Sequence, residues 1–320
     1  VLNVAADHLG IGDIDTLEQI AHLKSVVAEA VQPNGYAILN ADDPLTAEMR
    51  DRVKSKLAWF SMSADNPLVQ EHTQQGGLAA VYENGYLSIL QGDWTLRIEQ
   101  AANVPLTMGG RAPFMIANAL AASLAAYTYG VQIEQIRAGL TSFRASSSQT
   151  PGRMNLFNLG EYHALVDYAH NPHSYEALGG FVRNWTAGEK IGVIGGPGDR
   201  RDEDFILLGR LAAEIFDRII IKEDDDNRGR PRGDASELIA KGIMQVKPDC
   251  RYEIILDETT AINTGLDTAS NGSLVVILPE SVSRAISLIE ARSPLSDNSL
   301  QPPVAAQDSS TGIVSSVNQI

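Results

Sequence analysis

Short apolar runs alternate with helical segments along the second half of the chain, and this alternation restricts the possible fold most. The apolar runs lie at 164–166, 191–194, 219–221, 252–255 and 274–277. Segments with helical spacing lie at 173–185, 203–216, 235–245, 258–269 and 281–291. Strands that alternate with helices form parallel sheets with helices on both faces. Residues 150–292 are therefore predicted to form a Rossmann-like, doubly wound α/β domain.

The first half of the chain has a mixed pattern. Helices are predicted at 14–32, where Asp15 or Thr16 can cap the start, and at 45–55, 113–129 and 133–140. Strands are predicted at 36–39 and 57–60, and the apolar run at 1–4 is expected to be another. Residues 78–106 change to strand periodicity with Asn-Gly at one turn, which predicts a small antiparallel sheet.

Two stretches of low periodicity divide the chain. The segment 146–152 contains Ser, Gln, Thr, Pro and Gly and is typical of a linker, and 293–320 is rich in Ser, Gln, Asn and Pro. The expected domains are therefore 1–148 and 150–292, followed by a disordered tail at 293–320. Because the chain begins on an apolar run without a Met, we expect it to start partway through a domain.

Composition excludes several classes of protein. The formal net charge of −15 argues against a general nucleic-acid binder or a protein held on anionic membranes. No apolar stretch approaches the roughly 20 residues that a transmembrane helix needs. The single cysteine, Cys250, rules out a disulfide framework within the chain and fits a reducing cytoplasm.

Four polar clusters follow or interrupt apolar runs, at 3–8, 150–153, 167–172 and 195–202. In parallel sheets, ligands collect where such strands end. Together the clusters contain a His of the metal-binding type, several carboxylates, three Arg and a Gly-rich loop. This set suits chemistry on phosphates and carboxylates.

The first cluster ends in Asp7 and His8. His8 could bind a hard metal beside phosphate, or the pair could cap a strand end. Lys24 lies among apolar residues of a predicted helix, where a buried ammonium is costly unless it is modified or paired; the simpler interpretation is a side chain that extends to solvent. Asn118 could be only an inward polar residue near a helix start.

The third cluster follows the strand at 164–166. Asp167 in that position suits the two hydroxyls of a ribose, and His170 and Asn171 lie beside it. Asn171 precedes Pro172, so it could instead cap the next helix. Both interpretations stay open.

The Gly-rich loop at 195–202 opens a helix. Its glycines would let a ligand approach closely, and its two Arg, Arg200 and Arg201, could pair with a carboxylate or phosphate in a bidentate way. The loop lacks the Gly-Lys-Ser/Thr of a P-loop. The acidic run of Asp224, Asp225 and Asp226 is either a solvated loop or a site for a guanidinium or ammonium group, with Arg228 or Arg230 on the same substrate's carboxylate.

In this order the clusters resemble the Mur ligase family, whose members join amino acids to carboxylates with ATP. The resemblance depends on Asn3…Asp7-His8, Gly152-Arg153 and Asp167 to Pro172. The strings at 150–160 and 222–230 look like those of the cyanophycin synthetases within that family. The resemblance to the Mur ligase family covers about residues 1–292. It implies a partial Mur ligase central domain followed by a Mur ligase C-terminal domain.

The resemblance implies a cytoplasmic ligase that uses ATP and Mg²⁺ to add L-arginine to the aspartate side-chain carboxylate of cyanophycin. The carboxylate would become an acyl phosphate, which the α-amine of arginine attacks. The implied partners are the cyanophycin primer, L-arginine, further copies of the chain, and the rest of the synthetase with its P-loop segment and aspartate-adding ATP-grasp half. Neither nucleic acid nor a membrane is expected as a partner.

The family roles carry over residue by residue. His8 would be a Mg²⁺ ligand, and Lys24, as a carbamate, another. Arg153 would hold the nucleotide phosphates, Asp167 the ribose, and Asn118 the adenine. The cleft that faces the C-terminal domain would be lined by His170, Asn171, Arg200 and Arg228. Charge complementarity, rather than the family, predicts that Asp224, Asp225 and Asp226 receive the incoming arginine.

The sequence departs from the family in two places. The family's phosphate-binding Gly-x-x-Gly-Lys-Thr/Ser loop and metal-binding Glu precede the Asn3…His8 motif, and the chain contains neither, so we expect a fragment that is inactive alone. Ala112-Pro113 replaces the family's His-Asn pair, which weakens the role of Asn118. The alternative is a non-catalytic binding or assembly module derived from a Mur-type ligase. A nucleotide-linked oxidoreductase is suggested only by the loop at 195–198.

Overall fold

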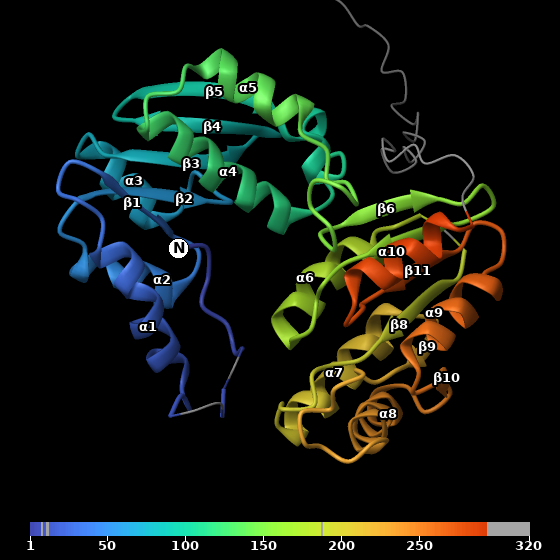
Figure 1. The fold of residues 1–320 in the computed structure, drawn as a ribbon. Helices are drawn as coiled ribbons and strands as arrows, with labels where there is room; N and C mark the ends of the chain where they lie inside the picture. Colours follow the sequence, from blue (N-terminus) through green and yellow to red (C-terminus); the bar gives the residue numbers. More distant parts are fainter. Residues whose placement is uncertain (8, 11–12, 187, 293–320) are drawn as a thin grey trace, which may run out of the picture.

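The computed structural model describes residues 1–7, 9–10, 13–186 and 188–292, which form two α/β units (Figure 1). Each unit has one β-sheet with helices packed on both faces. The predicted fold class is therefore confirmed. The tail predicted at 293–320 lies outside the described residues. Within the described ranges, no helix is long and apolar enough to cross a membrane.

The first unit contains a five-stranded sheet in the order β1-β2-β3-β4-β5. Its strands are β1 (Tyr36–Asn40), β2 (Lys56–Ser61), β3 (Leu78–Glu83), β4 (Tyr86–Gln91) and β5 (Trp94–Gln100). The first three run parallel, and β4 and β5 continue as an antiparallel meander. The predicted antiparallel strands thus exist, but they extend the parallel sheet because β3 pairs with β2.

Helices cover both faces of this sheet (Figure 1). One face packs against α1 (Leu17–Glu29), α2 (Pro44–Glu48) and α3 (Pro67–Gln74), and the other against α4 (Pro113–Thr128) and α5 (Ile133–Ser142). Short 3-10 helices lie at η1 (Met49–Arg52), η2 (Ala101–Asn103) and η3 (Pro105–Thr107). The sequence pattern missed α3, which begins at a cap made by Asn66 and is only two turns long.

Two local expectations in this unit need correction. The run at 1–4 is not a strand: it follows β1 through a bond from the Val1 amine to Ile38 O and one from Asn40 Nδ2 to Leu2 O. These contacts do not form the regular backbone ladder of a strand. Helix α1 is capped by Thr16, one of the two predicted capping residues, but it spans only Leu17–Glu29 of the predicted 14–32 and leaves Leu23, Val26 and Val27 more than half exposed.

The second unit contains a six-stranded sheet in the order β10-β9-β8-β11-β7-β6. Its strands are β6 (Asn155–Asn158), β7 (His163–Val166), β8 (Lys190–Ile194), β9 (Arg218–Ile221), β10 (Arg251–Ile254) and β11 (Leu274–Ile277). All pairs are parallel except β6 with β7. The five parallel strands match the predicted runs, whereas the antiparallel edge strand β6 was not predicted.

Helices on the two faces of this sheet enclose two cores. One core lies under α6 (Pro172–Arg183), α7 (Asp202–Ile215) and α8 (Asp234–Val246), and the other under α9 (Glu258–Asp267) and α10 (Val282–Glu290). The helices that follow β7 and β8 lie on one face of the sheet, whereas α10, which follows the inserted strand β11, lies on the other face, so the sheet has a switch point at β11. In such sheets this switch point is where ligands bind.

The two units share an apolar contact. Met108, Ala112 and Met115, at and before the start of α4, belong to the core that also contains Met154 and Leu156 of the second unit. Figure 1 shows α4 approaching α6 across the space between the sheets. The contact brings the end of the segment 1–7 and the strand ends of the second sheet to the same region.

Two glycines allow α7 and α8 to pack with their backbones in contact. A Cβ at Gly209 would lie 2.0 Å from Ile239 O, and a Cβ at Gly242 would lie 2.0 Å from Ile206 O. Neither helix can move away without opening the core beneath it. The close approach thus requires glycine at both positions.

We expect Gly209→Ala to lower the free energy of unfolding by about 2–4 kcal/mol, because the added methyl group overlaps a backbone oxygen. Gly180→Ala is the matched control, since a Cβ at this position of α6 would have no neighbour within 4 Å. The control should stabilise the protein by about 0.5–1 kcal/mol through helix propensity. Urea unfolding of both variants measures the difference, and equal effects would contradict the packing argument.

Candidate active site between the two units

An ion cluster joins the first unit to the second. Asp7 Oδ1 lies 3.1 Å from Arg200 Nη2, and Asp7 Oδ2 lies 3.6 Å from His170 Nε2. Arg200 comes from the loop after β8 and His170 from the loop after β7, so the two strands beside the switch point supply both partners. Residues 193 positions apart in sequence thus meet between the units.

The environment of His170 favours its charged form. The nearby carboxylate of Asp7 raises the pKa of His170 above its ordinary value, and this effect exceeds the opposing effect of burial. The Nδ1 atom lies 3.0 Å from Tyr168 O, so the backbone orients the ring. The charged imidazole of His170 and the guanidinium of Arg200 both lie beside the Asp7 carboxylate. Another anion could take the place of this carboxylate at the two cationic groups.

Arg200 is almost fully buried, with 7% of its side chain exposed. Its Nη1 lies 3.4 Å from Asp199 Oδ1, and Asp199 Oδ2 in turn lies 2.7 Å from Arg228 Nη1. Within the described part of the chain, the buried Nε atom of Arg200 has no hydrogen-bond partner. A buried guanidinium with a spare donor is suited to bind a further oxygen anion.

The Gly-rich loop packs closely against the loop that follows β9. A Cβ at Gly195 would lie 2.6 Å from Lys222 O, and one at Gly198 would lie 2.1 Å from Asn227 O. Arg230 fastens the contact by donating to Gly198 O and Arg200 O. Gly195 and Gly198 are therefore needed for the packing of the two loops.

Asp167 ends β7 in a poorly solvated position. Burial raises the pKa of its carboxyl group to about 6, although the Met154 N–H and the positive charge of Arg153 act to lower it. Arg153 itself is exposed, with its guanidinium carbon 5.7 Å from the centre of the Tyr168 ring. An acceptor, a cation and an aromatic face thus lie together near the start of the second unit.

The raised pKa of Asp167 has a consequence for stability. Because the folded-state pKa of about 6 exceeds the ordinary 3.8, its contribution to stability is present below pH 3.8 and is lost as pH rises through 6. The Asp167→Asn variant lacks this loss, so we expect its free energy of unfolding to rise by about 2 kcal/mol relative to that of wild type between pH 4 and pH 7. Urea unfolding across this range is the measurement.

Asp257→Asn provides a control of opposite sign. Hydrogen bonds from Thr260 lower the pKa of Asp257, so the wild-type carboxylate adds stability as pH rises. The free energy of unfolding of Asp257→Asn should therefore fall relative to that of wild type as pH rises, which is the opposite of the change expected for Asp167→Asn. A flat difference for Asp167→Asn would show that its carboxyl group titrates normally.

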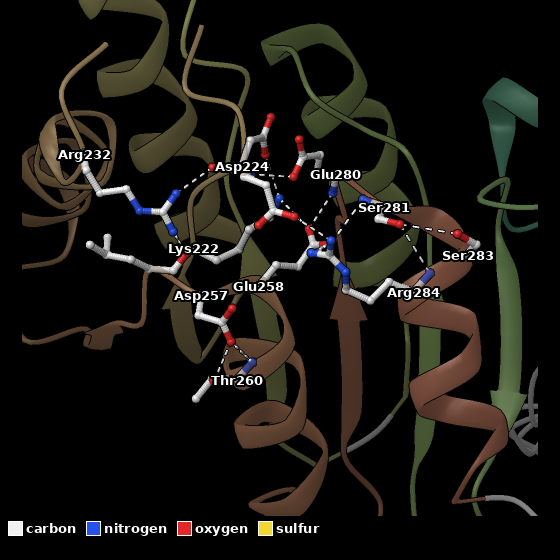
Figure 2. A network of polar contacts seen from close by, with 12 residues as sticks. Lys222, Asp224, Arg232, Asp257, Glu258, Thr260, Glu280, Ser281, Ser283 and Arg284 are labelled. Carbon is white, nitrogen blue, oxygen red and sulfur yellow. Dashed lines mark hydrogen bonds and ion pairs between the residues drawn. The ribbon is translucent and has the colours of Figure 1, made fainter. Parts of the chain in front are cut away.

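A buried charge network organises the neighbouring strand ends (Figure 2). Glu258, with no exposed surface, accepts from Lys222 Nζ at 2.8 Å and Arg284 Nη1 at 3.3 Å, and also from the backbone N–H groups of Glu280 and Ser281. Lys222 Nζ also lies 2.9 Å from Asp224 Oδ1. The network ties the loops after β9 and β11 to the start of α9.

The three predicted acids occupy different surroundings. Asp224 is buried against Lys222, Asp225 pairs with Arg284 at 2.5 Å, and Asp226 Oδ1 accepts from the Arg228 N–H at 2.8 Å. Asp225 and Asp226 are exposed, whereas Asp224 is not. Of the three acids, Asp225 and Asp226 therefore face solvent at this edge of the sheet.

The remaining predicted residues lie apart or serve local roles. Asn171 caps α6 by accepting from Ser174 N, and Asn118 donates to Met115 Sδ near the apolar contact between the units. Lys24 is exposed and donates to Asn3 O at 3.1 Å, which places it beside the segment that leads to Asp7. His8 lies outside the described residues.

Sequence reasoning missed Glu258, Glu280 and Arg284. Each stands in or beside the first turn of a predicted helix, where a charged residue is ordinary. Only the pairing of strands distant in sequence brings them to Lys222. The acidic first turn of α7, in contrast, was visible in the sequence and makes that helix start a poor anion site.

Two family models match the chain, each over one of the units. The Mur ligase middle domain matches residues 1–126, and the Mur ligase, glutamate ligase domain, matches residues 152–281. The chain belongs to the Mur ligase family. The resemblance carried by the motifs at 3–8 and 167–172 is thereby confirmed.

Individual proteins agree with this assignment. Cyanophycin synthetase from Nostoc sp. is 70% identical over all of this chain, which spans 35% of that protein. Cyanophycin synthetase from Trichormus variabilis is 70% identical over 99% of the chain, again over 35% of its own length. The chain thus spans about a third of the length of these relatives.

A solved structure supports the fold. E. coli FolC, in complex with ADP and without folate substrate, superposes with a TM-score of 0.62 at 18% identity, covering 91% of this chain and 61% of FolC. At this identity the likeness concerns the fold alone.

Proposed function

We propose that this chain forms the nucleotide-binding and C-terminal part of an ATP-dependent amide ligase that adds L-arginine to cyanophycin. The observation that carries the proposal is the ion cluster of Asp7, His170 and Arg200 between two Mur ligase units. The 70% identity to cyanophycin synthetases supports the choice of substrates.

The residues between the units fit an anionic nucleotide. Arg200 has a buried donor to spare, and Arg153 is exposed beside Asp167. In this proposal Arg153 binds nucleotide phosphates, Asp167 accepts from the ribose hydroxyls, and Asn118 lies toward the adenine. ADP in the FolC structure supports a nucleotide in this fold.

The present arrangement is closed. A cavity lined by Asp7, His170 and Arg200 has a volume of only about 10 Å³, and a second one, beside Lys222 and Asp224, about 20 Å³. Each is close to the size of one water molecule. In our proposal, phosphate oxygens replace the Asp7 carboxylate at Arg200 when the units separate and admit the nucleotide.

Fewer residues are proposed for Mg²⁺ than for the nucleotide. Within the described ranges, no group of three or more His, Cys, Asp or Glu side chains could hold a metal ion. The proposed Mg²⁺ ligands are therefore His8, outside the described residues, and Lys24, which can bind a cation only as a carbamate because an ammonium repels it. When bound, Mg²⁺ would offset negative charge on the phosphates.

The proposed reaction has two steps. The side-chain carboxylate of a primer aspartate attacks the γ-phosphorus of ATP, which releases ADP and leaves an acyl phosphate. The arginine α-amine then attacks the acyl carbon, forms an amide and releases phosphate. Arg200 and His170 supply positive charge to the transferring group, and Arg228 and Asn171 complete the cleft.

The first test is ADP release by the intact protein that contains this chain. Release should require ATP, Mg²⁺, an aspartyl primer and arginine, each omitted in turn. We expect Arg200→Ala to lower the rate about a hundredfold or more, since a buried cation at a transferring phosphate is lost. Arg200→Lys, which keeps the charge but loses the bidentate geometry, should be intermediate.

Arg210→Ala is the control, because it removes the same charge from the exposed side of α7. It should retain the wild-type rate, and thermal unfolding should show that all three variants are folded. Failure of the wild-type protein to release ADP with all four components would instead favour a non-catalytic binding or assembly module.

The arginine site is proposed at the three acids after β9. Asp225 and Asp226 are exposed beside Arg228, so a guanidinium could bind the acids while Arg228 holds the α-carboxylate. Arg284 would have to release Asp225, and Asp224 would keep its buried position. The substrate then enters from the solvent side of the loop.

We expect Asp225→Asn and Asp226→Asn each to raise the KM for arginine about tenfold while kcat and the KM for ATP change little. Loss of one charge-assisted hydrogen bond is of this size. Asp249→Asn, an exposed carboxylate away from this loop, is the control. An unchanged KM for arginine in both variants would remove the assignment, without affecting the ADP-release test.

A further inference from the structure

Strand β10 forms an open end of the second sheet. Among the strands of the described ranges it pairs with β9 alone (Figure 1). All four of its residues are exposed. An open strand edge presents unpaired N–H and C=O groups that can pair with another chain. Proteins usually cover or block such edges, so the residues of β10 decide what this edge can accept.

The backbone direction determines which groups face outward. Ile255 N donates to Ile221 O, and the parallel register pairs Ile254 with Ile221. Because successive residues of a strand direct their backbone groups to alternate sides, the groups of Arg251 and Glu253 point to β9. Those of Tyr252 and Ile254 therefore point to the open side.

The side chains divide between the two faces of the sheet. Tyr252 and Ile254 pair with Ile219 and Ile221, which belong to the core under α8, so they lie on the face that α8 covers. They are 37% and 42% exposed, and the end of α8 adds exposed Met244 and Val246. Arg251 and Glu253 point to the opposite face. One face of the edge is thus apolar, and the other carries one cation and one anion.

We propose that β10 pairs in antiparallel fashion with β10 of a second copy of the chain, with the two-fold axis at Tyr252. In this register Tyr252 lies opposite its own equivalent, and Arg251 of each copy lies opposite Glu253 of the other. The result is one continuous sheet through two units. A two-fold interface uses the same surface on both copies, so the surface must be complementary to itself.

The charges select this register. Outward-facing residues must pair with outward-facing residues, so the axis passes through a residue rather than between two. An axis at Glu253 would place two carboxylates directly opposite each other, and an axis at Ile254 would leave both charges without an opposite partner. The axis at Tyr252 alone forms two cross-strand pairs of opposite sign. Within one copy Arg251 also contacts Glu189, which leaves further guanidinium donors available.

A disulfide between copies tests the register. Tyr252→Cys places a thiol opposite its equivalent across the axis, at a Cβ separation that suits a disulfide after small adjustment. We expect the intact protein with this change to form a covalent dimer under mild oxidation on a non-reducing gel. Glu253→Cys is the matched control, since its equivalent lies two positions away, and it should remain monomeric on the gel, as should wild type.

Charge reversal tests the pairing independently of cysteine chemistry. Arg251→Glu or Glu253→Arg alone would place like charges opposite at two positions and should weaken self-association about tenfold. The double variant exchanges the two charges and should recover to within about threefold of wild type. Sedimentation equilibrium measures the association constant, and circular dichroism shows that these exposed changes leave the fold intact.

The absence of a covalent dimer in Tyr252→Cys would overturn the proposal. So would a double variant that associates no better than the single variants. Equal cross-linking of the Tyr252→Cys and Glu253→Cys proteins would show an unspecific contact instead of this register.

Discussion

The buried carboxylate of Glu258 is the interaction on which the geometry of the second unit depends. A charge with no exposed surface is stable only if donors surround it. Lys222, Arg284 and two backbone N–H groups meet that need, and they come from the ends of two strands and the start of α10. Removing any one of the charged partners leaves an uncompensated charge, so the loops are held together.

The position of the Gly-rich loop follows from this anchoring. Lys222 is fixed by Glu258 and Asp224, and Gly195 packs directly on the Lys222 carbonyl. Arg230 then holds the far end of the loop, so that Arg200 faces Asp7 of the first unit. The cation that the proposed chemistry needs is thus positioned by a network that does not itself contact the proposed nucleotide.

The space between the units combines two kinds of contact. Apolar packing of Met108, Ala112 and Met115 against the second core has no directional requirement, whereas the Asp7–Arg200 pair has a specific geometry. An anion of higher charge than a carboxylate competes well for Arg200. This arrangement is consistent with a ligand that opens the units and takes the place of Asp7. The β10 edge lies on the far side of β9 from the switch point, so pairing there leaves the cleft accessible.

The sequence by itself determined the secondary structure of the second unit and the strand ends where polar groups gather. Alternating apolar runs and helical segments permit few other arrangements, and strand ends are marked by abrupt changes to Gly, Asp and Arg. Short elements such as α3 and β6 were missed because they contain too few residues to show a period. The run at 1–4 was taken for a strand because apolar content does not reveal whether a backbone partner is present.

Only the tertiary structure decided which of these polar groups meet. Asp7 and Arg200 lie 193 positions apart, and the partners of Glu258 come from both directions along the chain. Strand order, with β11 inserted between β7 and β8, determines these meetings, and strand order depends on how whole faces pack. The tertiary structure also decided the role of the glycines in the loop at 195–198. Whether the space left by a missing Cβ admits a ligand or a neighbouring loop depends on what the fold places opposite it.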